Sequence, residues 1–198
     1  MGVLSRSLEN PSDEHISGGK RLLRYLKGTI EYGLLYSREI NCSLYLFSDS
    51  DYANDTCTRK STSGMIAMLG KCTVSWRSQQ QKCISISTTE AEYVAASEAV
   101  KDIIWLKRLW NEFTNVKCTC TLYLDNQSAI KMIKNPEYHK RTKHIDIRFH
   151  FIREHYSTGE FDLQYIGSSD QLADILTKPL PKPQFCYLRN FLVTNFNK

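Results

Sequence analysis

Residues 42–51, CSLYLFSDSD, decide the fold that this chain is expected to adopt. The four residues 44–47 are all apolar, and such an uninterrupted run is typical of a strand that is buried on both faces of its sheet. Only Ser48 separates Asp49 from this run. We therefore predict a buried strand over residues 42–48 that presents an acid at its end.

Apolar runs predict four further strands, at Gly64–Leu69, Cys72–Trp76, Thr119–Leu124 and Phe161–Ile166. Gly70-Lys71 forms a short hairpin turn between the first two of them. In the last strand, alternation places Phe161, Leu163 and Tyr165 on one face. Helices are expected at 11–28, from Thr88 or Thr89 to Phe113, from Asn126 to Pro136, from Thr142 to Gly159, at 170–176 and through 185–192. This order predicts an α/β fold, in which helices flank a mixed five-stranded sheet that begins with an antiparallel meander.

Four carboxylates stand out by their positions: Asp49, Glu92, Asp125 and Asp174. Asp125, like Asp49, follows a strand-like run, whereas the other two lie in helix-like stretches. Acids that come from the ends of different elements can converge on one point, where their oxygens suit Mg²⁺ or Mn²⁺. Such a cluster commonly serves two-metal hydrolysis of a phosphodiester. Taken singly, each acid also has an ordinary interpretation as a turn, cap or surface residue.

The choice of Glu92 over Glu90 depends on the expected long helix. Its apolar residues recur at steps of three and four, at Ala96, Ala99, Ile103, Leu106, Trp110 and Phe113. Extending this stripe backward leads to Glu92, whereas Glu90 lies on a more polar row. We therefore expect Glu92 to be the acid that points inward.

The charge of the chain is compatible with a polyanionic partner but does not require one. Lys and Arg number 26 against 21 Asp and Glu, so the net charge is +5. Residues 59–62 and 139–144 form two basic stretches. Contact with nucleic-acid phosphates and a solvated loop remain equally open interpretations for each stretch.

Several classes of site are not expected. The seven cysteines include no CxxC pair, and the histidine spacings do not match those of zinc ligands. We find no signal peptide, and no apolar run approaches the roughly 18 residues that span a bilayer. The chain is therefore expected to be an intracellular protein with reduced thiols and no membrane contact.

Six motifs occur in a specific order: SDSDYA at 48–53, RKSTSG at 59–64, STTEAEY at 87–93, LDNQSA at 124–129, RTKHIDIR at 141–148 and QLADILTKPLP at 171–181. With them, the chain resembles the ribonuclease H domain of a copia-type (Pseudoviridae-like) LTR retrotransposon Pol polyprotein. The resemblance runs from about residue 10 to about residue 192, and residues 11–36 resemble the tail of the preceding reverse transcriptase. It implies three parts: a reverse transcriptase tail at 1–40, a ribonuclease H domain at 41–180 and a helical tail at 181–198.

The resemblance also implies a function. It implies an endonuclease that hydrolyses the RNA strand of RNA–DNA hybrids with two Mg²⁺ ions, Mn²⁺ being an alternative. Its partner would be the reverse transcriptase part of the same polyprotein, in a cytoplasmic virus-like particle or in the nucleus. The chain has no reverse transcriptase aspartate pair and no protease or integrase motif, so we do not expect it to polymerise DNA. Tyr52 stands where the family commonly has Trp.

The implied site residues fall into two groups. The catalytic and metal-binding acids are Asp49, Glu92, Asp125 and Asp174, with Asp170 as the alternative to the last. The implied nucleic-acid-binding residues are Arg59, Lys60, Ser61, Thr62, Asn126, Gln127, Lys140, Arg141, Lys143 and His144.

Two other interpretations stay open. A catalytically silent remnant could bind hybrids or polyprotein neighbours without cutting, although the four acids are intact. An integrase or a Holliday-junction resolvase would use the same fold, but the Glu on the first long helix and the motif order argue against both.

Overall fold

The structure is a computed structural model that describes residues 2–37, 43–135 and 143–196. The described residues form two compact units, one of residues 36–192 and one of residues 1–35 with 193–198. The larger unit contains all the predicted strands and acids. The boundaries expected from the family resemblance, after residues 40 and 180, stay predictions. In the ranges described, no helix combines the length and the apolar character that crossing a bilayer requires.

The larger unit is built on a five-stranded mixed sheet with the order β4-β3-β2-β5-β6. β2 (Ser43–Asp51), β3 (Thr62–Leu69) and β4 (Cys72–Gln80) form the predicted antiparallel meander. β5 (Thr119–Leu124) runs parallel to β2, and β6 (Asp162–Tyr165) runs parallel to β5. The α/β prediction is therefore confirmed. Because β2 continues to residue 51, Asp49 lies inside the strand and not after it.

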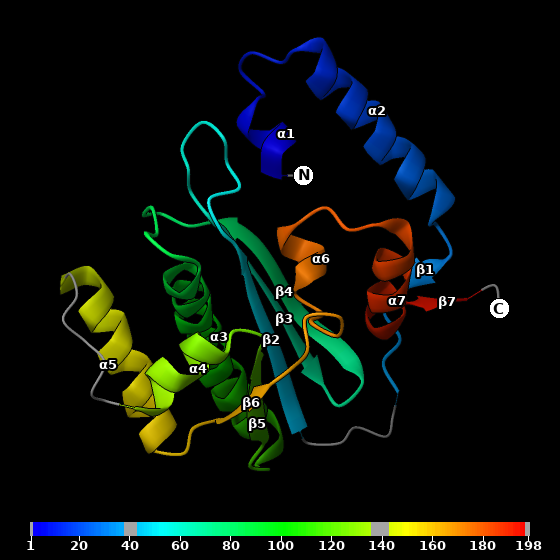
Figure 1. Cartoon of the computed structure of the whole chain (residues 1–198). Coiled ribbons are helices and arrows are strands. Elements are labelled where there is room, and N and C mark those ends of the chain that lie inside the picture. Colours follow the sequence, from blue (N-terminus) through cyan, green and yellow to red (C-terminus); the bar gives the residue numbers. More distant parts are fainter. Residues whose placement is uncertain (1, 38–42, 136–142, 197–198) are drawn as a thin grey trace. The chain divides into compact units, whose positions relative to one another are not determined.

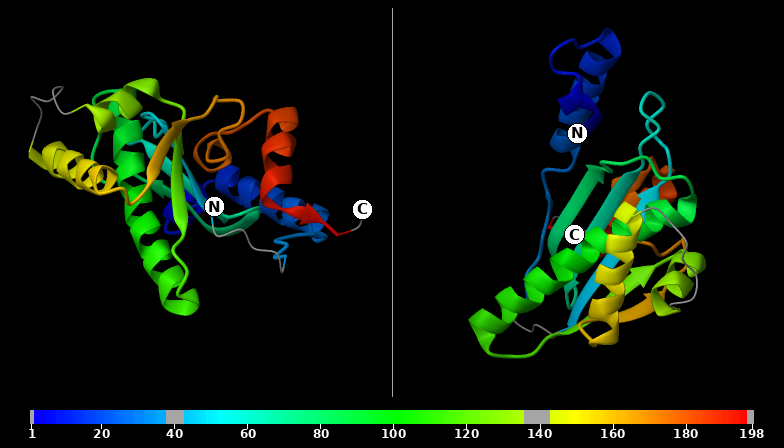
Figure 2. Two further views of the ribbon diagram at one scale, coloured as in Figure 1. Left: turned by 90° about the horizontal axis from the view of Figure 1, so that it is seen from below. Right: turned by 90° about the vertical axis from the view of Figure 1, so that its left-hand side faces the viewer.

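Helices cover both faces of the sheet (Figures 1 and 2). α3 (Thr88–Thr114), α4 (Gln127–Lys134) and α5 (Lys143–Ser157) pack on one face, and the right-hand view of Figure 2 shows α5 beside α3. α6 (Asp174–Thr177) contacts β2, β3 and β4, and α7 (Lys182–Leu192) follows it on the second face. The result is three layers with the sheet in the middle.

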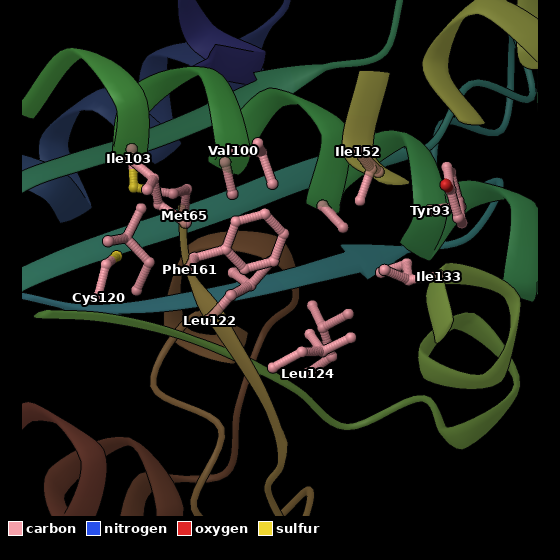
Figure 3. Close-up of a cluster of buried hydrophobic side chains, with 14 of the residues drawn as sticks. Met65, Tyr93, Val100, Ile103, Cys120, Leu122, Leu124, Ile133, Ile152 and Phe161 are labelled. Atoms are coloured by element: carbon pink, nitrogen blue, oxygen red, sulfur yellow. The ribbon is translucent and has the colours of Figure 1, made fainter. Parts of the chain in front are cut away.

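The strand β2 is buried on both faces, as its unbroken apolar run predicts. Leu44 and Leu46 belong to the core under α3 and α5, whereas Tyr45 and Phe47 pack with the cluster under α6 and α7. Figure 3 shows the larger core, where side chains of α3 and α5 gather with those of β5, such as Leu122. The alternation of side chains along one strand thus joins the three layers.

Several predicted details of the elements are corrected. The N-cap of α3 is Ser87, whose hydroxyl accepts the Glu90 N–H, and neither of the two threonines that follow. The apolar stripe of α3 leaves the core before its predicted end, since Leu106 still packs against the core whereas Phe113 is 80% exposed. Tyr165 is exposed as well, so it does not share the buried face of the last strand. The predicted helix limits Pro136 and Thr142, like Cys42 of the first predicted strand, lie outside the described residues.

The smaller unit contains α1 (Gly2–Arg6), α2 (Asp13–Gly28), and the short strands β1 (Tyr32–Gly33) and β7 (Thr194–Asn195). β1 pairs with β7 in antiparallel register. Ser12 caps α2 through a reciprocal pair of hydrogen bonds with His15. The predicted helix at 11–28 is therefore confirmed, with its first turn at residue 13.

Candidate active site

Three of the four predicted acids meet at one end of the central strands. Asp49 lies in β2, and Asp125 directly follows β5. In the parallel register Phe47 is beside Tyr123, and two residues further along, the same register brings Asp49 beside Asp125. Carboxylate oxygens of Asp49, Asp125 and Asp174 all lie within 4.8 Å of one another. We call these three residues the carboxylate cluster.

Gly64 explains how Asp174 reaches the other two. It is the cross-strand neighbour of Asp49, and a Cβ at this position would lie 2.6 Å from Thr177 Cγ2 and 2.9 Å from the Ala173 carbonyl. The missing side chain therefore lets α6 approach the sheet closely. In this position the Thr177 hydroxyl donates a hydrogen bond to Asp49 Oδ2. The glycine thus positions the helix that carries the third acid.

Glu92 adjoins the cluster from the second turn of α3. Its Oε1 accepts the Ser50 N–H at 3.1 Å, and its buried Oε2 has no hydrogen-bond partner among the described residues. Burial, together with the charges of Asp49 and Asp125, raises the pKa of Glu92 well above its ordinary value. A buried carboxylate oxygen without a partner is costly unless a cation or a proton compensates it.

Glu90, although it shares a row of α3 with the exposed Lys101 and Arg108, is buried as well. Its carboxylate accepts the Ile86 N–H at 3.0 Å and so completes the start of α3. Burial alone therefore does not separate the two glutamates. Their partners do, because Glu90 stabilises the helix start, whereas Glu92 binds the strand that carries Asp49.

The structure distinguishes Asp174 from Asp170. Asp170 is exposed, and its carboxylate accepts hydrogen bonds from Tyr187 and Ser169. Asp174 is 4% exposed and lies in the carboxylate cluster. Of the two acids left open by the sequence, Asp174 is the one whose position suits a shared site.

Lys178 is a site residue to which sequence reasoning assigned no role. Its Nζ lies 2.9 Å from Asp174 Oδ1 and 4.0 Å from Asp49 Oδ2. The signal that could have identified it is its spacing of four residues from Asp174, which returns a side chain to the same helix face.

Two buried glutamines hold the elements of the site together and were also missed. Gln81 donates hydrogen bonds to the Ala91 carbonyl at 2.9 Å and to Ser50 Oγ at 3.3 Å, so it ties the start of α3 to β2. Gln171 donates to the Ser48 carbonyl at 3.0 Å and ties the segment before α6 to the same strand. Nothing in the local sequence indicates their burial, because glutamine is usually exposed.

The residues expected to bind nucleic acid have different surroundings. Arg59 and Gln127 are exposed, Lys60 is half-buried, and Thr62 begins β3. Asn126 caps α4 by accepting the Ala129 N–H at 2.9 Å. Lys140 and Arg141 lie outside the described residues, as do the side chains of Lys143 and His144.

Ser61 requires a correction. Its side chain is fully buried, and its hydroxyl accepts the Ala53 N–H at 3.1 Å. Ala53 has a positive φ of 51°, so this hydrogen bond stabilises a loop conformation that is uncommon for alanine. In this structure Ser61 shapes the loop and is not accessible to a ligand.

The ionisation of Asp174 predicts a dependence of stability on pH. Burial is the largest cause that raises its pKa from 3.8 to about 7, and the Asp49 charge adds to it, against the opposing effect of Lys178. A carboxyl group whose pKa is raised by folding stabilises the chain below its unfolded pKa, and this contribution is lost as the pH rises through the folded pKa. Without cations, the free energy of unfolding should therefore fall between about pH 4 and pH 7.

Asp174→Asn should remove a fall on the order of 2–3 kcal/mol between pH 5 and pH 8, since about two pKa units of the shift lie above pH 5 and each corresponds to about 1.4 kcal/mol. Urea unfolding in EDTA at pH 5 and at pH 8 measures the difference in the free energy of unfolding between the two pH values. Asp170→Asn is the matched control and should keep the wild-type dependence. Equal slopes for all three chains would contradict the prediction.

Comparisons with known proteins find relatives that match most of this chain. The retrovirus-related Pol polyprotein from transposon TNT 1-94 of Nicotiana tabacum is 43% identical over 185 residues, which are 93% of this chain and 14% of that protein. The corresponding polyprotein from transposon RE2 of Arabidopsis thaliana is 38% identical over 92% of this chain and 13% of its own length. The chain thus spans only about one seventh of the curated relatives it matches. No family model matches it.

Solved structures show the fold. The N-terminal RNase H domain of rv2228c from Mycobacterium tuberculosis, solved as a fusion with maltose-binding protein, has a TM-score of 0.51 at 8% identity. That match covers 75% of this chain and 96% of the other. LC11-RNase H1, solved in complex with an RNA/DNA hybrid, has a TM-score of 0.51 at 14% identity and covers 68% and 94% of the two chains. The chain therefore belongs to the family of retrovirus-related Pol polyproteins of copia-type transposons, and it corresponds to their segment with the ribonuclease H fold.

Proposed function

We propose that this chain hydrolyses the RNA strand of RNA–DNA hybrids. The observation that carries the proposal is the convergence of Asp49, Asp125 and Asp174 within 4.8 Å, with Glu92 beside them, on a ribonuclease H fold. Support comes from LC11-RNase H1, a protein of the same fold that was solved with an RNA/DNA hybrid. The family of transposon Pol polyproteins gives such a hybrid a place in reverse transcription.

The residues fit divalent cations of the magnesium type. All donors in the cluster are carboxylate oxygens, which hard cations prefer, and Glu92 Oε2 is buried without a partner among the described residues. We propose that Asp49, Asp125, Asp174 and Glu92 hold two Mg²⁺ ions, with Mn²⁺ as a substitute. When bound, these ions would lower the pKa of the attacking water and stabilise the leaving oxygen.

The chain itself contributes a fixed arrangement of charges. Thr177 orients Asp49, the Ser50 N–H orients Glu92, and the Ser168 hydroxyl donates to Asp125 Oδ2 at 2.9 Å. Groups that are already oriented need no reorganisation when charge develops in the reaction, and this is the main source of electrostatic catalysis.

The surface around the site would bind the substrate backbone. Arg59, Lys60 and Gln127 are at least partly accessible and are proposed to contact phosphates and sugars. The preference for RNA would come from 2′-hydroxyl contacts and minor-groove shape, because an A-like hybrid hides its base identity.

The reverse transcriptase part of the same polyprotein is the proposed partner. The chain spans 14% of the TNT 1-94 polyprotein, so most of such a protein lies outside it. An intracellular location, within the virus-like particle of the element, belongs to the same proposal.

Cleavage of an RNA–DNA hybrid with a label on each strand tests the proposed function. With Mg²⁺ or Mn²⁺ we expect cuts in the RNA strand alone, leaving 5′-phosphate and 3′-hydroxyl ends. EDTA should abolish them, and a DNA duplex of the same sequence should stay intact. A folded chain that binds the hybrid but never cuts it, even with Mn²⁺, would instead support the silent remnant.

A further inference from the structure

Lys178 places a positive charge inside the carboxylate cluster. Its Nζ lies 2.9 Å from Asp174 Oδ1 and 4.0 Å from Asp49 Oδ2. The lysine is the C-cap residue of α6, whose first residue is Asp174, so one short helix brings both side chains to the same point. Its side chain is 35% exposed, which means that it enters the cluster from the rim of the site.

The lysine ammonium and the proposed cations need the same oxygens. Divalent cations such as magnesium prefer carboxylate oxygens, so a bound ion would compete with the ammonium for the charge of Asp174 Oδ1. Two cations close together would also repel each other strongly in a partly buried site. Contact of Asp174 with Lys178 and binding of a divalent cation there should therefore oppose each other.

Without a positive charge the cluster would be unfavourable. Its three carboxylates have oxygens within 4.8 Å of one another, and Asp49 and Asp174 are almost fully buried. Like charges at such distances repel, and burial strengthens the repulsion. The Lys178 ammonium contacts the two most buried of the three, so it compensates the cluster where compensation is needed most.

We propose that Lys178 is a resident counterion of the carboxylate cluster, which a divalent cation displaces when it binds at Asp49 and Asp174. The inference rests on the proposed function, because it takes the cluster to be a cation site. The lysine stabilises the carboxylate cluster when no cation is bound and lowers its apparent affinity for cations, since only chains whose lysine has left are competent to bind. Its flexible stem lets the displaced ammonium return to solvent at the rim.

Binding of Mn²⁺ to the chain without nucleic acid tests the counterion role. Electron paramagnetic resonance of free Mn²⁺ at pH 7.5 and low salt gives the dissociation constant. Lys178→Met should bind Mn²⁺ about tenfold more tightly, or more, than the wild type. In EDTA it should melt at a lower temperature, because the acids have lost their counterion.

Two further variants make the test specific. Lys182→Met, at the exposed start of α7, removes the same net charge outside the cluster and should bind Mn²⁺ like the wild type. Lys178→Arg keeps the charge and should not tighten binding. Equal dissociation constants for Lys178→Met and Lys182→Met would overturn the counterion role while leaving the metal site intact. Absence of Mn²⁺ binding from both the wild type and Lys178→Met would overturn the metal site of the proposed function and this inference with it.

Discussion

Asp49→Asn is expected to slow cleavage of the RNA strand by on the order of a thousandfold or more, while the chain stays folded. Asp49 is 2% exposed, lies beside Asp125 in the parallel register and accepts a hydrogen bond from Thr177 of the helix that carries Asp174, so it adjoins both other acids. An amide keeps the shape and can still accept the Thr177 hydrogen bond, but it carries no charge to hold a divalent cation. Loss of several kcal/mol of charge stabilisation corresponds to a factor of this size.

Single-turnover cleavage rates with saturating Mg²⁺ measure the effect of Asp49→Asn. Thermal unfolding in EDTA shows that the variant is folded, and relief of repulsion should make it at least as stable as the wild type. Asp170→Asn is the control, because its carboxylate binds Tyr187 outside the cluster. A rate within about tenfold of the wild type for Asp49→Asn would refute the assignment of the site.

Gly64→Ala is expected to weaken both the fold and the site. The added Cβ would lie 2.9 Å from the Ala173 carbonyl and 3.1 Å from Leu176 Cβ, and both contacts belong to α6 or to the residue before it. Backbone atoms cannot rotate away as a side-chain end does, so α6 must move outward. Overpacking of this kind costs about 1–3 kcal/mol of unfolding free energy. The same movement withdraws Asp174 from Asp49 and should weaken Mn²⁺ binding.

Urea unfolding and Mn²⁺ binding measure the two consequences of Gly64→Ala. Gly19→Ala is the matched control, since a Cβ at that position in α2 meets no atom within 4 Å and alanine favours a helix. It should leave cation binding unchanged. If Gly64→Ala were as stable as the wild type and bound Mn²⁺ equally well, close approach of α6 would not be required.

The order of the elements was predictable because its signals are local. The apolar run at 44–47 and the hairpin at Gly70-Lys71 depend only on neighbouring residues, and both occur as expected in β2 and in the β3–β4 turn. The long helix was predicted within one residue at its end, but its cap was misplaced, because Ser87, Thr88 and Thr89 are all suitable caps.

Exposure was predicted less well than periodicity. Phe113 continues the apolar stripe of α3, and Tyr165 continues the alternation of the last strand, yet both are exposed. A periodic pattern shows which residues share a face, but it does not show how far along the element that face is covered. The covered length depends on where the neighbouring element ends and therefore on the tertiary structure.

The sequence by itself determined the fold class and assigned the four acids to four different predicted elements. This was possible because the strand and helix patterns and the ordered motifs depend only on contiguous residues. Only the tertiary structure decided how those acids are brought together and which group compensates their charge. Lys178 contacts Asp49 across 129 positions of the chain, Gly64 makes room for α6, and Gln81 joins α3 to β2. Such contacts depend on distances between elements that are far apart along the chain, and close packing sets those distances to within a few tenths of an ångström.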